Sequence, residues 1–360
     1  MGNYKILGLM SGTSLDGLDL ALCHLVEEGG SWRYTIEHTK EVPYSKKMRE
    51  TLGNAISLSD NDHMQLHRDY GSWLGKEAKK FMEEEKLEVD FIASHGHTSH
   101  HRPDQGITFQ LGDGQILANE SGTQVVCDFR SKDVSLGGQG APLVPIGDKL
   151  LFHQYDFCLN LGGISNISFE WEGKRIAFDI GLANMPLNHI TRSMGLEYDK
   201  DGGLARSGSL DPHLLDRLDR LEYYRLPHPK STGYEWFVAE VLPLIQVSDR
   251  PKIDQLNTFV HHNCGQIAAV VHRYSKGSKA KLLATGGGAL NPYFMEVLRE
   301  RLGPNIEVPQ PKRDLIAYKE ALIFALMGAL RMEGRINVLR SVTGAREDSC
   351  SGELYLPQGD

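Results

Sequence analysis

The sequence lacks several features that would place it in a familiar class. Its five cysteines include no C-x-x-C pair, so we expect neither a zinc ribbon nor a disulfide framework, and reduced cytoplasmic thiols are the default. No apolar run approaches the roughly 20 residues that a membrane helix needs, and the N-terminus carries no small-residue cleavage site of a signal peptide. We therefore expect a cytoplasmic protein without a membrane partner.

Strong positive charge and two common nucleotide motifs are also missing. The formal net charge is −8 and the basic residues are scattered, which argues against nucleic acid as a partner but permits a small anion in a local pocket. No G-x-x-x-x-G-K-[ST] segment occurs and no G-x-G-x-x-G follows a strand, which excludes a P-loop protein and disfavours a Rossmann dehydrogenase. With 360 residues, the chain is long enough for two domains.

What is present is a repeated pattern of apolar strand, glycine-containing turn and second strand. Residues 4–10 and 18–25 flank the turn SGTSLDG, and residues 155–181 repeat the pattern around a Gly-Gly turn. Laying the first copy on the second pairs Tyr4 with Tyr155, Ile6 with Phe157, Gly12 with Gly163 and Ser14 with Ser165. This shared pattern predicts an α/β chain built by internal duplication.

Helices are expected between and after these strands. Apolar residues recur at helical spacing over residues 61–86, and residues 315–334 form the most apolar helix, which we expect between packed layers. We place an N-terminal domain at 1–140, with 341–360 packing back on it, and a C-terminal domain at 141–340.

Three glycine-rich turns, at 11–17, 159–166 and 282–291, each follow a predicted strand. Glycine lets backbone amides approach a phosphate, and the third turn precedes a helix whose N-terminus suits a pyrophosphate. Gly, Ser and Asp also occur in plain turns, but three such turns at strand ends predict a nucleotide in a cleft between two related domains. Asp16 and Asp19 would repel a bare phosphate, so they imply a divalent cation or a neutral part of the site.

These segments, together with SHGHT, DFRSKDVSLGGQGAPLVP, KSTG and SVTGA, resemble the sequences of anhydro-N-acetylmuramic acid kinases, in the same order from residue 8 to residue 345. The resemblance implies the actin-like ATPase fold, with two ribonuclease-H-like domains around an inter-domain nucleotide cleft. It also implies that ATP, with Mg²⁺, phosphorylates O6 of 1,6-anhydro-N-acetylmuramic acid while water opens its anhydro ring, in peptidoglycan recycling. A homodimer is implied as well.

The resemblance further implies roles for single residues. Asp179 would be the base that takes the proton of water, and Arg130 would meet the sugar carboxylate or the transferring phosphoryl group. From the residues alone, Asp179 could be a strand-end turn residue and Arg130 a surface cation. The substrate-side residues would be His95, His97, Thr98 and Glu320, although Glu320 could equally be the polar edge of an apolar helix. The ATP-binding residues would be Gly12, Thr13, Ser14, Leu15, Asp16, Gly17, Leu18, Asp19, Gly162, Gly163, Gly286, Gly287 and Gly288.

Neither a metal site nor the sugar's identity follows directly from these segments. The histidines of SHGHT, with His100 and His101, lack the carboxylate or cysteine spacing of a metal centre. Leu182 and Ala183 replace Pro and Gly of the family pattern F-D-x-G-P-G-N, and Asn188 stands where a later Asp is expected. Because the changes cluster near the sugar, a kinase of another amino sugar remains an alternative. A nucleotide-gated actin-like binding module is a second one, disfavoured by the short tail after SVTGA.

Overall fold

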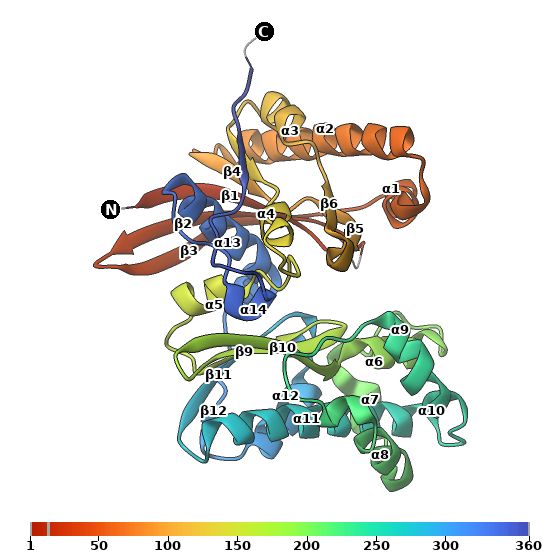
Figure 1. The fold of residues 1–360 in the computed structure, drawn as a ribbon. Coiled ribbons are helices and arrows are strands. Elements are labelled where there is room, and N and C mark those ends of the chain that lie inside the picture. Colours follow the sequence, from red (N-terminus) through yellow and green to blue (C-terminus); the bar gives the residue numbers. More distant parts are fainter. Residues whose placement is uncertain (1, 13–14, 359–360) are drawn as a thin grey trace. The chain divides into compact units, whose positions relative to one another are not determined.

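The protein consists of two compact units in the computed structural model, which describes residues 2–12 and 15–358. Unit 1 comprises Met1–Leu151 and Tyr318–Asp360, and unit 2 comprises Phe152–Ala317 (Figure 1). These boundaries differ from the expected 1–140 and 141–340. The second one falls inside helix α13 (Arg313–Met332), which is kinked at Tyr318 (φ −112°, ψ 17°), so most of this helix and the segment 341–360 belong to unit 1.

A six-stranded sheet forms the centre of unit 1, in the order β13-β7-β4-β1-β2-β3. The strands are β1 (Asn3–Ser11), β2 (Gly17–Glu28), β3 (Ser31–Pro43), β4 (Phe91–Ser94), β7 (Val125–Cys127) and β13 (Glu353–Tyr355). The first three run antiparallel as a meander, and β4 and β7 continue the sheet parallel to β1. A separate ribbon pairs β5 (His97–Arg102) with β6 (Ile107–Leu111).

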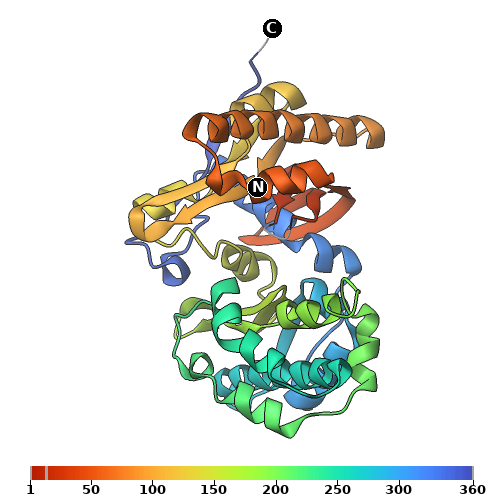
Figure 2. The ribbon, with the colours of Figure 1, turned by 90° about the vertical axis from the view of Figure 1, so that its right-hand side faces the viewer.

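Helices cover both faces of this sheet. Leu7, Leu9 and Ile92 pack with side chains of α2 (Asp60–Glu85) and α3 (Gly114–Ser121) on one face. Figure 2 shows the long helix α2, in orange, running along this side of unit 1. On the other face lies α13, whose Gly328 sits over Phe91 and Ala93. The remaining helices of unit 1 are α1 (Lys46–Gly53), η1 (Ala55–Ser57), η2 (Pro103–Gln105), α4 (Ser131–Ser135), α5 (Pro145–Leu151) and α14 (Arg340–Thr343). Within the described ranges no helix, α13 included, has the length and apolarity to cross a membrane.

Gly8 allows the backbones of β1 and α13 to approach each other closely. A Cβ at this position would lie 2.2 Å from the backbone carbonyl oxygen of Ala321, and a backbone atom of a packed helix cannot move away cheaply. We expect Gly8→Ala to lower the free energy of unfolding by about 3 kcal/mol, as overpacked substitutions do. The midpoint of urea unfolding measures this loss. Gly265→Ala is the matched control, since a Cβ there meets nothing within 4 Å and the position lies inside helix α11; an equal loss in both variants would contradict the expectation.

Unit 2 repeats the topology of unit 1. Its strands β8 (Phe157–Leu161), β9 (Ile164–Trp171), β10 (Lys174–Leu182), β11 (Ala280–Thr285) and β12 (Ile306–Glu307) lie in the order β10-β9-β8-β11-β12. Apart from the extra edge strand β13 of unit 1, both sheets therefore have the order 3-2-1-4-5 when their strands are numbered within each sheet, with the first three strands antiparallel and the last two parallel to the first. The parallel ladder to the fourth strand starts at Ile6 in unit 1 and at Phe157 in unit 2, the pair that the sequence aligned. The duplication and the ribonuclease-H-like α/β fold are thus confirmed.

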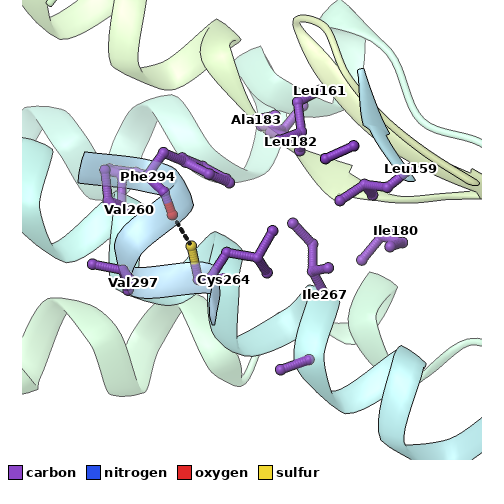
Figure 3. Packing of buried hydrophobic residues seen from close by; sticks show 14 of the residues in the cluster. Leu159, Leu161, Ile180, Leu182, Ala183, Val260, Cys264, Ile267, Phe294 and Val297 are labelled. Carbon is purple, nitrogen blue, oxygen red and sulfur yellow. Dashed lines mark hydrogen bonds between the residues drawn. The ribbon is translucent and has the colours of Figure 1, made fainter. Parts of the chain in front are cut away.

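The core of unit 2 lies between its sheet and two helices, α11 (Lys252–Ser275) and α12 (Pro292–Leu302). Figure 3 shows Leu159, Leu161 and Ile180 from the sheet facing Ile267 and Cys264 of α11. The thiol of Cys264 donates to the carbonyl of Phe294 on α12 (3.5 Å). The other helices are α6 (Asn184–Arg192), η3 (Lys200–Gly202), α7 (Gly203–Ser207), α8 (Pro212–Asp219), η4 (Glu222–Arg225), α9 (Tyr234–Trp236), the π-helical η5 (Phe237–Val241), α10 (Leu242–Gln246) and η6 (Gly287–Leu290).

Candidate active site

Eight of the predicted ATP-binding residues lie in the turn between β1 and β2 and at the start of β2. Thr13 and Ser14 lie outside the described residues. Gly12 directly follows β1, and Leu15 takes a left-handed conformation (φ 59°). Asp16 is exposed, and its carbonyl accepts a hydrogen bond from the Tyr44 amide (3.1 Å). Gly17, Leu18 and Asp19 already belong to β2, and the Leu18 side chain is only 1% exposed in the core. That side chain therefore has no surface left for a nucleotide.

Buried hydroxyl groups form a hydrogen-bonded chain at the end of β1, next to this turn. The Tyr44 hydroxyl donates to Ser11 Oγ (2.6 Å) and contacts the Tyr70 hydroxyl (2.7 Å), while Ser11 Oγ lies 3.0 Å from His97 Nδ1. Burial lowers the pKa of His97 to about 4, so the ring is neutral at physiological pH and shares one hydrogen bond with Ser11. Thr98 lies beside it on β5 and accepts from Gln110 (3.4 Å). His97 thus anchors the strand that leads into the turn.

Carboxylates gather beside the turn. Burial, together with the negative charges of Glu41, Glu320 and Asp16, raises the pKa of Asp19 to about 7. Burial also raises the pKa of Glu320, against the opposing effect of Arg130 and Lys319. A carboxyl group that is half protonated near neutral pH is one that a bound cation would readily ionise.

Arg130 is held by a histidine. Its Nε and Nη2 both donate to His95 Nε2, at 3.0 and 2.8 Å, and its Nη1 donates to the Gly140 carbonyl. Because a guanidinium cannot accept, His95 Nε2 must be the unprotonated nitrogen, and Nδ1–H donates to the Gly96 carbonyl (2.9 Å). Burial and the charge of Arg130 hold the pKa of His95 well below its usual value. Both ring nitrogens are occupied, so His95 orients Arg130 and has no nitrogen left for a sugar.

The Arg130 loop is fixed by a buried aspartate. Asp133 is fully buried, and its carboxylate accepts from the Thr343 hydroxyl (2.7 Å) and from the Gly140 amide (2.8 Å). The Gln139 amide in turn donates to the Thr343 carbonyl (2.8 Å). The DFRSKDVSLGGQG and SVTGA segments are therefore one structural group, and it presents the Gly140 carbonyl to Arg130.

The corresponding turn of unit 2, at Gly162 and Gly163, is tied to helix α6. The Asn184 side chain donates to the carbonyls of Leu161 (3.0 Å) and Gly162 (2.8 Å), and the Ala183 and Met185 amides donate to the Gly163 carbonyl. Neither glycine has a positive φ, and a Cβ on either would make only ordinary contacts. Nothing within the unit requires glycine here, which suits a turn whose backbone a ligand approaches.

The third glycine turn follows β11. A Cβ on Gly286, whose φ is 79°, would lie 2.4 Å from Asn160 Oδ1, and a Cβ on Gly288 would lie 2.8 Å from the Leu161 Cβ. These two glycines therefore allow close packing against β8, whereas a Cβ on Gly287 would meet nothing within 4 Å. Of the three, only Gly287 has no packing reason of its own.

Asp179 lies on β10 at an irregular point of its pairing with β9. One carboxylate oxygen, Oδ2, accepts from the Ser231 hydroxyl and from the Thr232 amide, both at 3.0 Å. Burial raises the pKa of this carboxyl group, while the two donors and the charge of Lys230 oppose the rise. A half-buried carboxylate with a raised pKa and a fixed orientation has the properties of a general base.

The departures from the family pattern lie at the end of β10 and in helix α6. Ala183 has φ −124° and ψ −92°, outside the usual helical and extended regions, and its methyl group is buried in the core with Leu182. Its carbonyl accepts from Asn263 (3.2 Å). Asn188 lies on α6, and its carbonyl accepts from Thr191 (3.1 Å).

The structure thus groups the predicted site residues by unit. Unit 1 joins the first turn, Asp19, Glu320 and Arg130, and unit 2 joins Asp179 with the two other glycine turns. The supporting residues Asp133, Thr343 and Ser231 were missed. The only sequence signal for these three residues is their place in the SVTGA, KSTG and DFRSKD segments.

Comparison with known proteins gives a match over almost the whole chain. The family model described as "Anhydro-N-acetylmuramic acid kinase" matches residues 4–357. An anhydro-N-acetylmuramic acid kinase of Aliivibrio fischeri is 35% identical, with 98% of this chain and 99% of the relative covered. One of Vibrio cholerae is 33% identical, with 98% of each covered. Among solved structures, component A of an Acidaminococcus fermentans (R)-2-hydroxyglutaryl-CoA dehydratase covers 90% of this chain and 96% of its own, with 13% identity and a TM-score of 0.43.

Proposed function

The chain belongs to the anhydro-N-acetylmuramic acid kinase family, and from this membership we propose which of its residues carry out the reaction. The enzyme is an ATP-dependent kinase of peptidoglycan recycling, which converts 1,6-anhydro-N-acetylmuramic acid, water and ATP into N-acetylmuramate 6-phosphate and ADP. Water forms a bond to C1 as the C1–O6 bond breaks. O6 then forms a bond to the γ-phosphorus, and the bond between that phosphorus and the oxygen leaving with ADP breaks.

We propose that Asp179 takes the proton of the attacking water. The observation that carries this role is its environment: a single half-buried carboxylate, with one oxygen bonded to Ser231 and Thr232 and with its pKa raised by burial. A raised pKa makes the carboxylate a stronger base. No separate acid is required, because the departing O6 is captured by phosphorus.

Arg130 is proposed to bind an anionic group of the substrates. Burial lowers the pKa of its guanidinium to about 10, so it remains a cation at neutral pH. Its planar, two-pronged donor set suits a carboxylate or a phosphoryl group, and both the lactyl carboxylate of the sugar and the γ-phosphate are candidates. We assign His95 the task of orienting Arg130, and we keep His97, Thr98 and Glu320 on the substrate side.

For ATP we propose the backbone of the turns at Gly12–Asp19 and at Gly162–Gly163, together with Gly287. Asp19 would contact Mg²⁺, since burial and the negative charges of Glu41, Glu320 and Asp16 raise its pKa and a nearby cation would relieve the repulsion. Among the described residues no group of three His, Cys, Asp or Glu side chains could hold a metal ion. Mg²⁺ bound with ATP keeps phosphates and water as most of its ligands. When bound, Mg²⁺ supplies neutralisation of the phosphate charge.

Binding of Mg·ATP should release protons near neutral pH. The pKa of Asp19 is raised to about 7 in the free protein, and a nearby cation lowers it, so binding at pH 6.5 should expel part of a proton. Calorimetry of Mg·AMP-PNP binding in two buffers of different ionisation enthalpy measures this number. Asp19→Asn should bind without proton release, and equal release by both proteins would contradict the assignment.

The proposed setting is the cytoplasm, with a homodimer as the assembly. The test of the function is a reaction of the full chain with ATP, Mg²⁺ and the anhydro sugar, in which ADP and the sugar phosphate are counted together. We expect one reducing 6-phosphosugar for each ADP. ATP turnover without a phosphorylated sugar, or stimulated only by a protein, would overturn the proposal, and turnover with a different amino sugar alone would reassign the substrate.

A further inference from the structure

The KSTG segment lies against Asp179, although the roles proposed above leave it unused. The Asp179 amide donates to the Lys230 carbonyl (3.2 Å), and the Ser231 hydroxyl and the Thr232 amide both donate to the Asp179 carboxylate at 3.0 Å. Three consecutive residues therefore hold the backbone and the side chain of one aspartate. A turn that only reverses the chain direction would not require these three hydrogen bonds to one aspartate.

The two donors to the carboxylate reach the same oxygen. Both end on Oδ2, and within residues 2–12 and 15–358 no hydrogen bond reaches Oδ1. A carboxylate with one oxygen saturated by donors has its other oxygen available as a proton acceptor. The segment thus makes the two oxygens of Asp179 chemically different.

The KSTG segment is itself held in place by contacts with Tyr223. Lys230 Nζ donates to the Tyr223 carbonyl (3.0 Å) and lies 4.4 Å from the centre of the Tyr223 ring. The Tyr223 hydroxyl donates to the Asp179 carbonyl (2.7 Å). Lys230 and Tyr223 are the titratable groups that face Asp179, and they close a ring of contacts around it.

We propose that Ser231 is a positioning residue of the reaction: with the Thr232 amide it occupies Oδ2 of Asp179, so that Oδ1 takes the proton of the attacking water. This inference rests on the proposed function, in which Asp179 is the base. The proton passes from water to Oδ1 as the oxygen of water bonds to C1. The Ser231 hydroxyl keeps its own proton throughout and only aims the carboxylate.

The test is Ser231→Ala in the full-length enzyme. Removing a donor to a charged group should lower kcat by about tenfold, with the KM for ATP unchanged. The lost donor favours the ionised carboxylate, so its removal raises the pKa of Asp179, and the acidic limb of the kcat/KM profile should move up by about one pH unit. Ser231 is exposed, so folding is not expected to suffer.

Two further variants make the result specific. Ser231→Thr keeps a hydroxyl and should restore both kcat and the pH profile. Ser207→Ala removes an exposed hydroxyl that donates only to the Leu204 carbonyl (2.7 Å), and it should leave both unchanged.

The results distinguish failure of the positioning role of Ser231 from failure of the proposed function. A Ser231→Ala enzyme with the wild-type kcat and profile, alongside an inactive Asp179→Asn enzyme, overturns the positioning role alone. A fall in kcat without a pH shift and without rescue by Ser231→Thr overturns it too, because it marks a purely structural effect. An active Asp179→Asn enzyme overturns the proposed function as well.

Discussion

Asp179→Asn should lower kcat for sugar-dependent ADP release by about 1,000-fold, which is the range for loss of a general base. The substitution keeps the size and the hydrogen-bonding shape of the side chain, since an amide oxygen can still accept from Ser231 and Thr232. It removes the group that can take a proton. The KM for ATP should therefore change little, while kcat and kcat/KM for the sugar fall together.

The pH dependence of kcat/KM in the wild-type enzyme should report the ionisation of the Asp179 carboxyl group. A base works only when it is unprotonated, so kcat/KM should fall as the pH drops through the pKa of Asp179. Burial raises that pKa above the usual aspartate value, so the acidic limb should lie at a higher pH than an exposed aspartate would give. The limb should be absent from any residual activity of Asp179→Asn.

Asp249→Asn is a suitable control, because Asp249 is an exposed aspartate of the same unit. Its activity should equal that of the wild type. If Asp179→Asn keeps more than a tenth of the wild-type kcat, another group takes the proton of water, and the assignment of the base is wrong.

Arg130→Met should lower kcat/KM by about 100-fold, as the loss of a charged donor aimed at developing or fixed negative charge does. Methionine fills part of the same volume but cannot bind an anion. The kinetic constant that changes identifies the anionic group that Arg130 binds. A fall in kcat indicates the transferring phosphoryl group, and a rise in the KM for the sugar indicates its carboxylate.

Two companions sharpen this result. Arg130→Lys should recover only part of the activity, because an ammonium group lacks the planar fork that donates to His95 and Gly140 at once. Arg33→Met, at a site where the side chain is 77% exposed, is the control and should be fully active. An Arg130→Met enzyme within tenfold of the wild type would mean that the guanidinium serves the fold alone.

The duplication was predictable from sequence because it is written in local pattern. Alternating apolar residues around a short glycine turn specify a hairpin wherever they occur, and both copies form an antiparallel hairpin. The boundary at Tyr318 was not predictable, because apolar residues keep helical spacing across the kink in α13. Periodicity reports a helix, and it does not report which unit each half of the helix belongs to.

The contacts that build the site were harder to foresee. Arg130 and His95 are 35 residues apart, and Asp133 and Thr343 are 210 apart, so no spacing rule joins them. The resemblance to a family identified the segments but not their partners. Leu18 shows the converse, because a residue that the resemblance assigned to ATP binding has its side chain buried in the core.

The discontinuity of unit 1 bears on how the chain can fold during synthesis. Unit 2 leaves the ribosome complete, whereas residues 1–151 must wait for residues 318–360, which supply the helix over one face of their sheet and the strand at its edge. The unit that comes second in the sequence can therefore finish folding first. Nascent chains that have not yet reached residue 318 leave the apolar face of the first sheet uncovered. Such an exposed apolar surface is prone to aggregation and is a substrate for chaperones.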